Sequence, residues 1–206
     1  RRIAQDTYEM VLQGDLSFAE NPGQFVNIKL DGFFLRRPIS VCDWQDGELT
    51  LIYKVLGRGT AQMATLPVGT ALDVLTGLGN GYDLSPAGEA PLLVGGGVGV
   101  PPLYKLAKAL LAEGKPVSVV LGFNTADEVF YADEFRALGC DVHVATADGS
   151  AGTKGFVTTA IAGQGIDFDY FYACGPLPML RALCAASDKP GFLSLEARMG
   201  CGFGAC

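Results

Sequence analysis

The first part of the chain, residues 1–82, shows the pattern of short β-strands. Residues 23–30 and 49–55 alternate between apolar and polar side chains, so each segment has one face suited to a core. Residues that favour turns interrupt the pattern at 21–23, 46–47 and 66–69. Several short strands at this spacing predict an antiparallel β-barrel or sandwich.

From residue 90 onward, apolar strands alternate with segments of helical spacing. The pattern predicts strands at 91–94, 117–123, 141–145 and 170–173, and helices at 102–113, 132–138 and 156–163. This order is typical of a parallel sheet wound on both faces by helices. With a linker at 83–89, we predict domains at 1–86 and 87–190, followed by a segment rich in Gly and Cys at 191–206.

Composition narrows the functional classes. Hydrophobic residues make up 49% of the chain, enough to bury a core, which excludes a disordered protein. The formal net charge is −7 and no basic cluster is longer than a pair, which argues against nucleic acid or an anionic membrane as partner. Apolar runs such as 116–123 are shorter than the roughly 20 residues of a membrane span. In a chain of this length, six cysteines indicate cytosolic thiols or metal ligands, so we expect a cytoplasmic protein.

A glycine-rich turn lies between a predicted strand and a predicted helix. Its sequence is Gly95-Gly96-Gly97-Val98-Gly99, with Pro101 where the usual dinucleotide pattern has a third glycine. Glycines in this context let the backbone approach a pyrophosphate, whose charge is met by N–H groups at the start of the helix. Gly96, Gly97 and Gly99 are therefore candidate cofactor contacts, and an ordinary tight turn is the alternative.

Cys174, Gly175 and Pro176 follow the last predicted strand. The carboxyl ends of parallel strands present ligands in such sheets, so this cysteine could lie beside a nicotinamide ring. Taken alone, a buried structural thiol explains it better; together with the glycine turn it predicts a nicotinamide-nucleotide site. Residues 122–128 contain two carboxylates, and no Lys or Arg occurs between 116 and 136, which favours NAD over NADP.

Two further segments suggest anion or metal binding. Arg37 and Ser40, at a spacing of three on an extended strand, could bind a phosphate, and Gly59-Thr60 could offer N–H groups to a second one. A surface basic pair and a turn are the alternative. Cys201 and Cys206 have the spacing that begins a plant-type [2Fe–2S] site, although a tail with ordinary thiols has the same spacing.

In this order the motifs resemble the ferredoxin–NADP reductase superfamily, in which a flavin-binding barrel precedes a nicotinamide-binding α/β domain. The segment Arg37-Pro38-Ile39-Ser40 resembles its flavin motif, with isoleucine where many members have tyrosine. The resemblance implies that Ile52, Tyr53, Lys54, Gly59 and Thr60 complete an FAD site. It also implies that residues 77–82 close the barrel beside the flavin.

Residues 196–206 closely resemble the family of electron-transfer subunits of class 1B dihydroorotate dehydrogenases. In that family this segment begins a four-cysteine [2Fe–2S] loop, which implies Cys201 and Cys206 as the first two ligands and two more beyond residue 206. The resemblance implies a heterotetramer in pyrimidine biosynthesis. An FMN-containing dihydroorotate dehydrogenase catalytic subunit would pass electrons through the cluster to FAD here, and a hydride would then reach NAD+.

This resemblance implies residues that bind cofactors rather than an acid or base that catalyses. Three alternatives remain open on the sequence. One is a related flavin reductase that feeds a ferredoxin or a hydrogenase. Another is a nucleotide-sensing module without catalysis, and the third is a scaffold subunit whose cysteines only pack.

Overall fold

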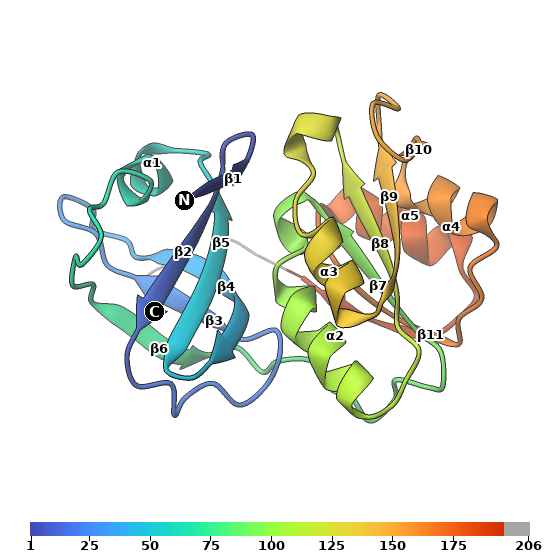
Figure 1. The fold of residues 1–206 in the computed structure, drawn as a ribbon, viewed down its shortest axis with the longest axis horizontal. Coiled ribbons are helices and arrows are strands. Elements are labelled where there is room, and N and C mark those ends of the chain that lie inside the picture. The colour runs from blue at the N-terminus through green and yellow to red at the C-terminus, as the bar shows by residue number, and fades with distance from the viewer. Residues whose placement is uncertain (196–206) are drawn as a thin grey trace.

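The computed structural model describes residues 1–195 and contains two sheets, one in each half of the chain (Figure 1). Six strands form the first sheet, with order β1-β2-β5-β4-β3-β6 and antiparallel neighbours throughout. Its elements are β1 (Arg2–Ala4), β2 (Thr7–Gln13), β3 (Phe25–Ile28), β4 (Arg37–Gln45), β5 (Glu48–Lys54), the short helix α1 (Arg58–Met63) and β6 (Val74–Leu78).

The first sheet curls around its own core. Alternate residues of the strands, among them Val26, Ile28, Val41 and Leu51, are buried together with Met63 of α1. This is the outcome of the alternating pattern, since every second side chain of a strand points to the same face. No hydrogen-bonded ladder joins β1 to β6 within residues 1–195, so the barrel is open along that edge.

The second sheet also has six strands, which are all parallel and follow the order β10-β9-β8-β7-β11-β12. The chain moves outward from β7 to β10 and then returns to the other side of β7, which makes the carboxyl end of β7 the topological switch point. The strands are β7 (Pro91–Gly96), β8 (Ser118–Phe123), β9 (Asp141–Thr146), β10 (Thr153–Lys154), β11 (Tyr170–Cys174) and β12 (Gly191–Ser194). The helices are η1 (Gly97–Gly99), α2 (Pro102–Ala112), η2 (Ala126–Glu128), α3 (Ala132–Leu138), α4 (Val157–Gln164) and α5 (Leu177–Ala186).

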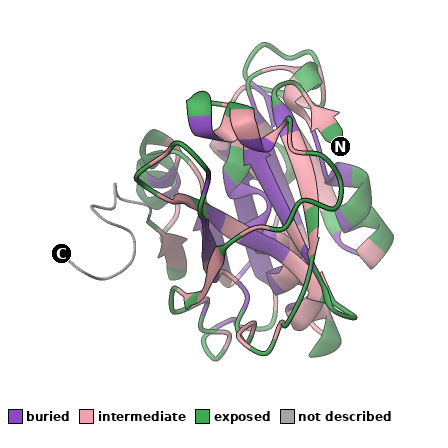
Figure 2. Cartoon of the chain, turned by 90° about the vertical axis from the view of Figure 1, so that its left-hand side faces the viewer, coloured by how far each residue is buried: buried purple, intermediate pink, exposed green. Residues whose placement is uncertain are grey.

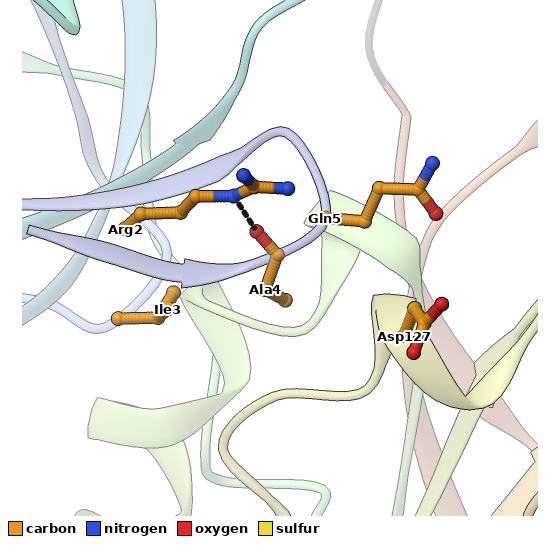
Figure 3. Close-up of a pocket in the computed structure, with 5 residues that line it drawn as sticks. All are labelled: Arg2, Ile3, Ala4, Gln5 and Asp127. Atoms are coloured by element: carbon orange, nitrogen blue, oxygen red, sulfur yellow. Dashed lines mark hydrogen bonds between the residues drawn. The ribbon is translucent and has the colours of Figure 1, made fainter.

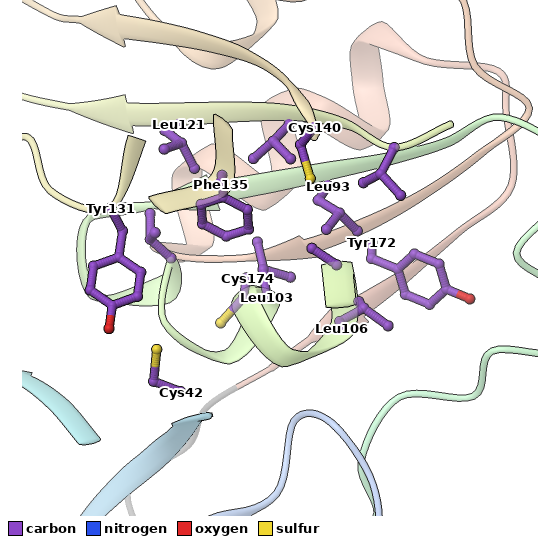
Figure 4. Close-up of a cluster of buried hydrophobic side chains, with 14 of the residues drawn as sticks. Cys42, Leu93, Leu103, Leu106, Leu121, Tyr131, Phe135, Cys140, Tyr172 and Cys174 are labelled. Atoms are coloured by element: carbon purple, nitrogen blue, oxygen red, sulfur yellow. The ribbon is translucent and has the colours of Figure 1, made fainter. Parts of the chain in front are cut away.

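Helices cover both faces of the parallel sheet, as the sequence predicts. Leu93 and Leu121 pack on one face against α2 and α3, where Phe135 is fully buried; Figure 4 shows this α2–α3 cluster. Leu92 and Val120 pack on the other face against α4 and α5. Strand β12 is an addition, because the sequence pattern did not indicate it. It pairs with β11 and carries the sheet to Ser194, past the boundary predicted at 190.

The two halves are packed against each other. Cys42 of β4 and Ile52 of β5 turn away from the core of their own sheet and are buried in the α2–α3 cluster. Beside them, the Asp43 carboxylate forms ion pairs with Lys105 (3.0 Å) and Lys108 (2.7 Å) of α2. Figure 2 shows the buried residues concentrated in the strands and the exposed residues in the loops and outer helix faces. None of the helices in residues 1–195 is long and apolar enough to span a bilayer.

Candidate functional site

The glycine turn and the segment after β11 meet at the switch point. Gly95 lies opposite Cys174 in the parallel ladder, and a Cβ at Gly99 would collide with the carbonyl group of Cys174. A Cβ at Gly175 would lie 3.1 Å from Cα of Gly96. Only glycines allow the two backbones to come this close, so the structure brings together the two segments that the sequence predicts to share a nucleotide site.

From the sequence, the phosphate is expected to be met by backbone N–H groups at the start of the helix, but the structure does not provide them there. Pro101 and Pro102 occupy the start of α2 and have no N–H group, so the first turn of the helix cannot supply the donors. The backbone N–H groups of the preceding turn, Gly97–Gly99, are the ones available to a phosphate. Gly97 has a φ of 52°, and no atom lies within 4 Å of the position its Cβ would take, so this corner is open.

Cys174 is buried at the end of β11, with 2% of its surface exposed (Figure 4). Its side chain belongs to the α2–α3 cluster, which also contains Leu103 and Cys42. This is the packing expected of a structural thiol. A contact between Cys174 and a nicotinamide ring therefore stays a prediction.

The loop after β8 is tied to the first sheet through Glu128. Its Oε1 accepts a hydrogen bond from Lys54 Nζ at 2.7 Å, and its Oε2 accepts from the backbone N (3.1 Å) and Nδ2 (2.8 Å) of Asn124. Burial would raise the pKa of Glu128, but the hydrogen bonds from Lys54 and Asn124 outweigh it and hold that pKa below its ordinary value. No Lys or Arg lies near this loop in the sequence, but Lys54 reaches it from β5, so a cation does lie beside it in the structure.

Asp127 borders a hollow of about 530 Å³ whose other residues come from the N-terminal hairpin, Arg2, Ile3, Ala4 and Gln5 (Figure 3). The backbone N–H of Gln5 donates to the carbonyl oxygen of Asp127 at 2.8 Å. The loop after β8 thus presents one carboxylate, Asp127, at an accessible rim, whereas the other, Glu128, is bound to Lys54.

A neighbouring turn, Asp148-Gly149-Ser150, was not predicted from the sequence. Ser150 Oγ accepts a hydrogen bond from the backbone N of Ala126 (2.7 Å), and Asp148 accepts from both the N–H and the hydroxyl of Ser150. These bonds lower the pKa of Asp148. The available signal was a short polar run with glycine directly after a predicted strand, at the edge where parallel sheets bind ligands.

On the first sheet, Arg37 is held against the start of α1. Its guanidinium lies over the ring of Phe33, 4.7 Å from the centroid, and donates to the carbonyl oxygen of Leu35 at 2.8 Å. A Cβ at Gly59 would collide with Arg37 Nε, so the absence of a side chain there makes room for the guanidinium. Arg36, by contrast, forms an ion pair with Asp73 at 2.9 Å. The two arginines are thus not an equivalent surface pair, and Arg37 is the one available to a phosphate.

Thr60 shapes the turn before α1. Its hydroxyl accepts hydrogen bonds from the backbone N–H groups of Leu56 (3.0 Å) and Gly57 (3.3 Å) and donates to the carbonyl oxygen of Gly57. This side chain is therefore used inside the protein, where it fixes the start of α1, the helix that carries Gly59.

The remaining predicted flavin contacts are distributed over both faces of the sheet. Ile39 and Tyr53 are 8% and 4% exposed and belong to the core of the first sheet, whereas Ile52 faces the α/β half. Burial raises the pKa of Tyr53 to about 12, and its ring stacks on Tyr8 across the strands. Pro38 is exposed and Ser40 partly buried at the edge of this core. The structure thus groups Arg37, Gly59 and Thr60, and leaves only the margins of Ile39 and Tyr53 accessible.

The two predicted cluster ligands, Cys201 and Cys206, lie outside the described residues. Within residues 1–195, no group of three or more His, Cys, Asp or Glu side chains is placed to hold a metal ion. The described part of the chain therefore offers no site for the cluster.

Comparison with known proteins identifies the family and the fold of the chain. Residues 93–185 match the family of oxidoreductase NAD-binding domains. Among solved structures, one described as an NADH-dependent reduced ferredoxin-NADP oxidoreductase superposes with a TM-score of 0.88 at 34% identity, covering 100% of this chain and 77% of that chain. A ferredoxin reductase of carbazole 1,9a-dioxygenase, at 23% identity and a TM-score of 0.79, shares the fold over 94% of this chain and 65% of its own.

Curated relatives cover the whole chain. A protein of Bacillus cereus named dihydroorotate dehydrogenase B (NAD(+)), electron transfer subunit, is 53% identical over 100% of this chain and 83% of its own length. A protein of Bacillus anthracis with the same name is 52% identical with the same coverage. Identity at this level along the entire chain, together with the paired antiparallel and parallel sheets, shows that the chain belongs to the family of dihydroorotate dehydrogenase B (NAD+) electron transfer subunits.

Proposed function

We propose that this protein carries electrons between a dihydroorotate-oxidising partner and NAD+, with FAD bound on the first sheet and NAD bound on the second. The observation that carries the proposal is the 53% identity over the full chain to a protein named as an electron transfer subunit of dihydroorotate dehydrogenase B. Bound FAD would supply the chemistry that this chain lacks, namely exchange of a hydride with NAD and exchange of single electrons with another centre.

The residues around Arg37 fit a flavin dinucleotide. Arg37 is a fixed cation that could neutralise a pyrophosphate, and the missing side chain of Gly59 makes room for its guanidinium. Thr60 fixes the turn that would bring backbone N–H groups to the same phosphates. The proposed flavin contacts are Arg37, Pro38, Ile39, Ser40, Ile52, Tyr53, Lys54, Gly59 and Thr60. Lys54 would contribute its backbone, because its Nζ is bound to Glu128.

The residues at the switch point fit a nicotinamide nucleotide. Gly96, Gly97 and Gly99 would let the backbone approach its pyrophosphate, while Cys174, Gly175 and Pro176 would border the nicotinamide at the end of β11. Asp127 presents a carboxylate at the rim of the loop after β8, which disfavours the additional phosphate of NADP. Hydride exchange needs no protein acid or base, so the role of these residues is to orient the nucleotide and to exclude water.

The proposed organisation of the whole protein follows the same resemblance. Residues 1–86 would form the FAD-binding domain and residues from 87 the NAD-binding domain, whose sheet includes β12 and ends at Ser194. In the segment that follows, Cys201 and Cys206 would ligate a [2Fe–2S] cluster, whose chemistry is single-electron transfer. The partner would be the FMN-containing catalytic subunit, in a cytoplasmic heterotetramer.

A direct test uses the full-length protein purified without oxygen. The flavin released by denaturation is identified by chromatography, and the visible spectrum is recorded before and after addition of NADH or NADPH. The proposal predicts FAD that is bleached by NADH and much more slowly by NADPH. A protein that binds no FAD would overturn the flavin assignment and favour a nucleotide-binding module, whereas equal rates with both nucleotides would overturn the choice of NAD.

A second candidate function has one observation in its favour. The solved reductase with a TM-score of 0.88 is 34% identical to this chain and is described as acting with ferredoxin. A protein serving ferredoxin would exchange electrons with it in the absence of any FMN subunit. Co-purification with an FMN-containing subunit separates the two candidates.

A further inference from the structure

An ion pair links the loop after β8 to the end of β5. The Nζ of Lys54 lies 2.7 Å from Oε1 of Glu128, and the two side chains are only 26% and 15% exposed. Because both groups are largely shielded from water, salt screens this pair less than it screens a surface pair. The second oxygen of Glu128 binds Asn124, so the same carboxylate also holds its own loop in shape.

The backbone of Lys54 is a proposed flavin contact, and Glu128 stands next to the proposed nucleotide site. After Lys54 the chain continues directly into the turn of α1, where Gly59 meets Arg37. Glu128 ends η2, in the loop that follows β8 at the carboxyl edge of the parallel sheet. In the same loop, Thr125 Oγ1 is buried without a hydrogen-bond partner in the described part of the protein, an arrangement that a bound polar ligand would relieve.

The other side-chain contacts between the two halves lie nearer to α2 and α3. Asp43 binds Lys105 and Lys108, and Tyr131 donates to Glu9 Oε2 at 3.2 Å. They hold the body of the α/β half against the first sheet. The loop after β8 is held separately, by the Lys54–Glu128 pair and by the backbone hydrogen bond from Gln5 to Asp127.

We propose that Glu128 is a positioning residue, which fixes the nucleotide-facing loop to the flavin-bearing sheet through Lys54 and so sets the alignment of the two cofactors. The expected effect on the rate of hydride transfer rests on the proposed function, whereas the expected effect on the packing of the two halves does not. Removing the charge of Glu128 would leave both cofactor sites in place and would let the two halves separate more often. Since a misplacement of about 1 Å can cost a hydride transfer about a hundredfold in rate, a small loosening is enough to be measured.

The chain contains its own reporter of this separation. Cys42 has no exposed surface and is covered by the α/β half, whereas Cys140 is buried inside that half, with 8% of its surface exposed. Labelling with N-ethylmaleimide followed by peptide mass spectrometry measures each thiol separately. Opening of the interface accelerates labelling of Cys42 but not of Cys140, while unfolding of the α/β half accelerates labelling of both.

The variant to make is Glu128→Gln, and the matched control is Glu113→Gln. Glu113 lies 3.8 Å from Lys115 in a pair that stays within the α/β half. In Glu128→Gln we expect labelling of Cys42 to rise about fivefold with labelling of Cys140 unchanged. Lys54→Met should produce the same rise, and the double variant should add nothing to either single change, since both remove the same contact.

The catalytic readout is the limiting rate at which saturating NADH bleaches the FAD-loaded protein. We expect a fall of about tenfold in Glu128→Gln, with the FAD dissociation constant within about twofold of the unchanged protein. If Glu128→Gln does not fold, Glu128→Asp should show smaller changes in the same direction, because its carboxylate is one methylene short of Lys54.

Two results would overturn the inference. One is labelling of Cys42 in Glu128→Gln at the rate of the Glu113→Gln control. The other is faster labelling with an unchanged limiting rate of bleaching, which would show that the pair does not align the cofactors. If NADH failed to bleach even the unchanged protein, the proposed function would fail, and the labelling would still decide whether the pair holds the halves together.

Discussion

Replacing Gly59 with alanine should displace Arg37 without removing any charge from the protein. The new Cβ would fall on Arg37 Nε, whose guanidinium rests over Phe33 and donates to the carbonyl oxygen of Leu35. Gly59 lies in α1 with an ordinary negative φ, so its backbone accepts alanine, which favours a helix by roughly 1 kcal/mol over glycine. We therefore expect the fold to be retained and the guanidinium to move.

The size of the effect follows from the contact that is lost. A hydrogen bond to a charged group contributes about 1.5–3 kcal/mol when its partner is removed, and each 1.4 kcal/mol changes a dissociation constant tenfold. If Arg37 binds the flavin pyrophosphate through one such bond, Gly59→Ala should weaken FAD binding by about 10- to 150-fold.

The assay is a titration of flavin-free protein with FAD, followed by flavin fluorescence, beside a thermal unfolding curve for each variant. Gly163→Ala is the control, because Gly163 lies in α4 with no atom within 4 Å of the position a Cβ would take, and it gains the same helix preference. FAD binding by Gly59→Ala within twofold of this control would refute the assignment of Arg37 to the flavin phosphate.

Three further changes test the packing and the nucleotide site. Gly99→Ala should force the glycine turn away from the carbonyl group of Cys174 and weaken NAD+ binding at least about tenfold in calorimetry; unchanged affinity would place the nucleotide elsewhere. Asp169 accepts two backbone N–H groups ahead of β7, at 2.6 and 3.1 Å, which lowers its pKa. The carboxylate thus stabilises the fold at pH values above its ordinary pKa of 3.8, and this stabilisation is lost as the pH falls through the lower pKa of the folded state. Asp169→Asn should therefore reduce the melting temperature at pH 7 and make it decline less steeply in acid. Melting temperatures that fall in parallel with pH in both proteins would contradict this. Phe135→Ala, at a side chain with no exposed surface, should cost about 3–5 kcal/mol in urea unfolding, and a loss below about 1 kcal/mol would show that the cluster refills the space.

The parts of the fold that follow from local pattern were predictable. The predicted helix at 132–138 has the bounds of α3, and the predicted strands of the α/β half lie within a few residues of β7, β8, β9 and β11. These elements carry strong apolar runs or helical spacing, which depend only on neighbouring residues. Strand β12 was missed because its residues, Gly191–Ser194, are too few to form a pattern and gain their structure from pairing with β11.

The candidate site also contains features that the sequence could predict and features that it could not. The meeting of the glycine turn with Cys174 was predictable, since both follow parallel strands and must reach the same edge of the sheet. The Lys54–Glu128 pair was not predictable, because its partners are 74 positions apart and come together only when the two halves pack. The role of Thr60 as a helix cap was also not predictable, since its hydroxyl binds the backbone of the preceding turn rather than a ligand.

The most direct test of the central claim joins this protein to its partner. The full-length protein is combined without oxygen with the FMN-containing catalytic subunit, and dihydroorotate and NAD+ are added while NADH and orotate are measured. The account predicts that NADH and orotate form in equal amounts, and only when both subunits are present. Reduction of the partner's FMN by dihydroorotate with no formation of NADH, although FAD is bound to this protein, would contradict it.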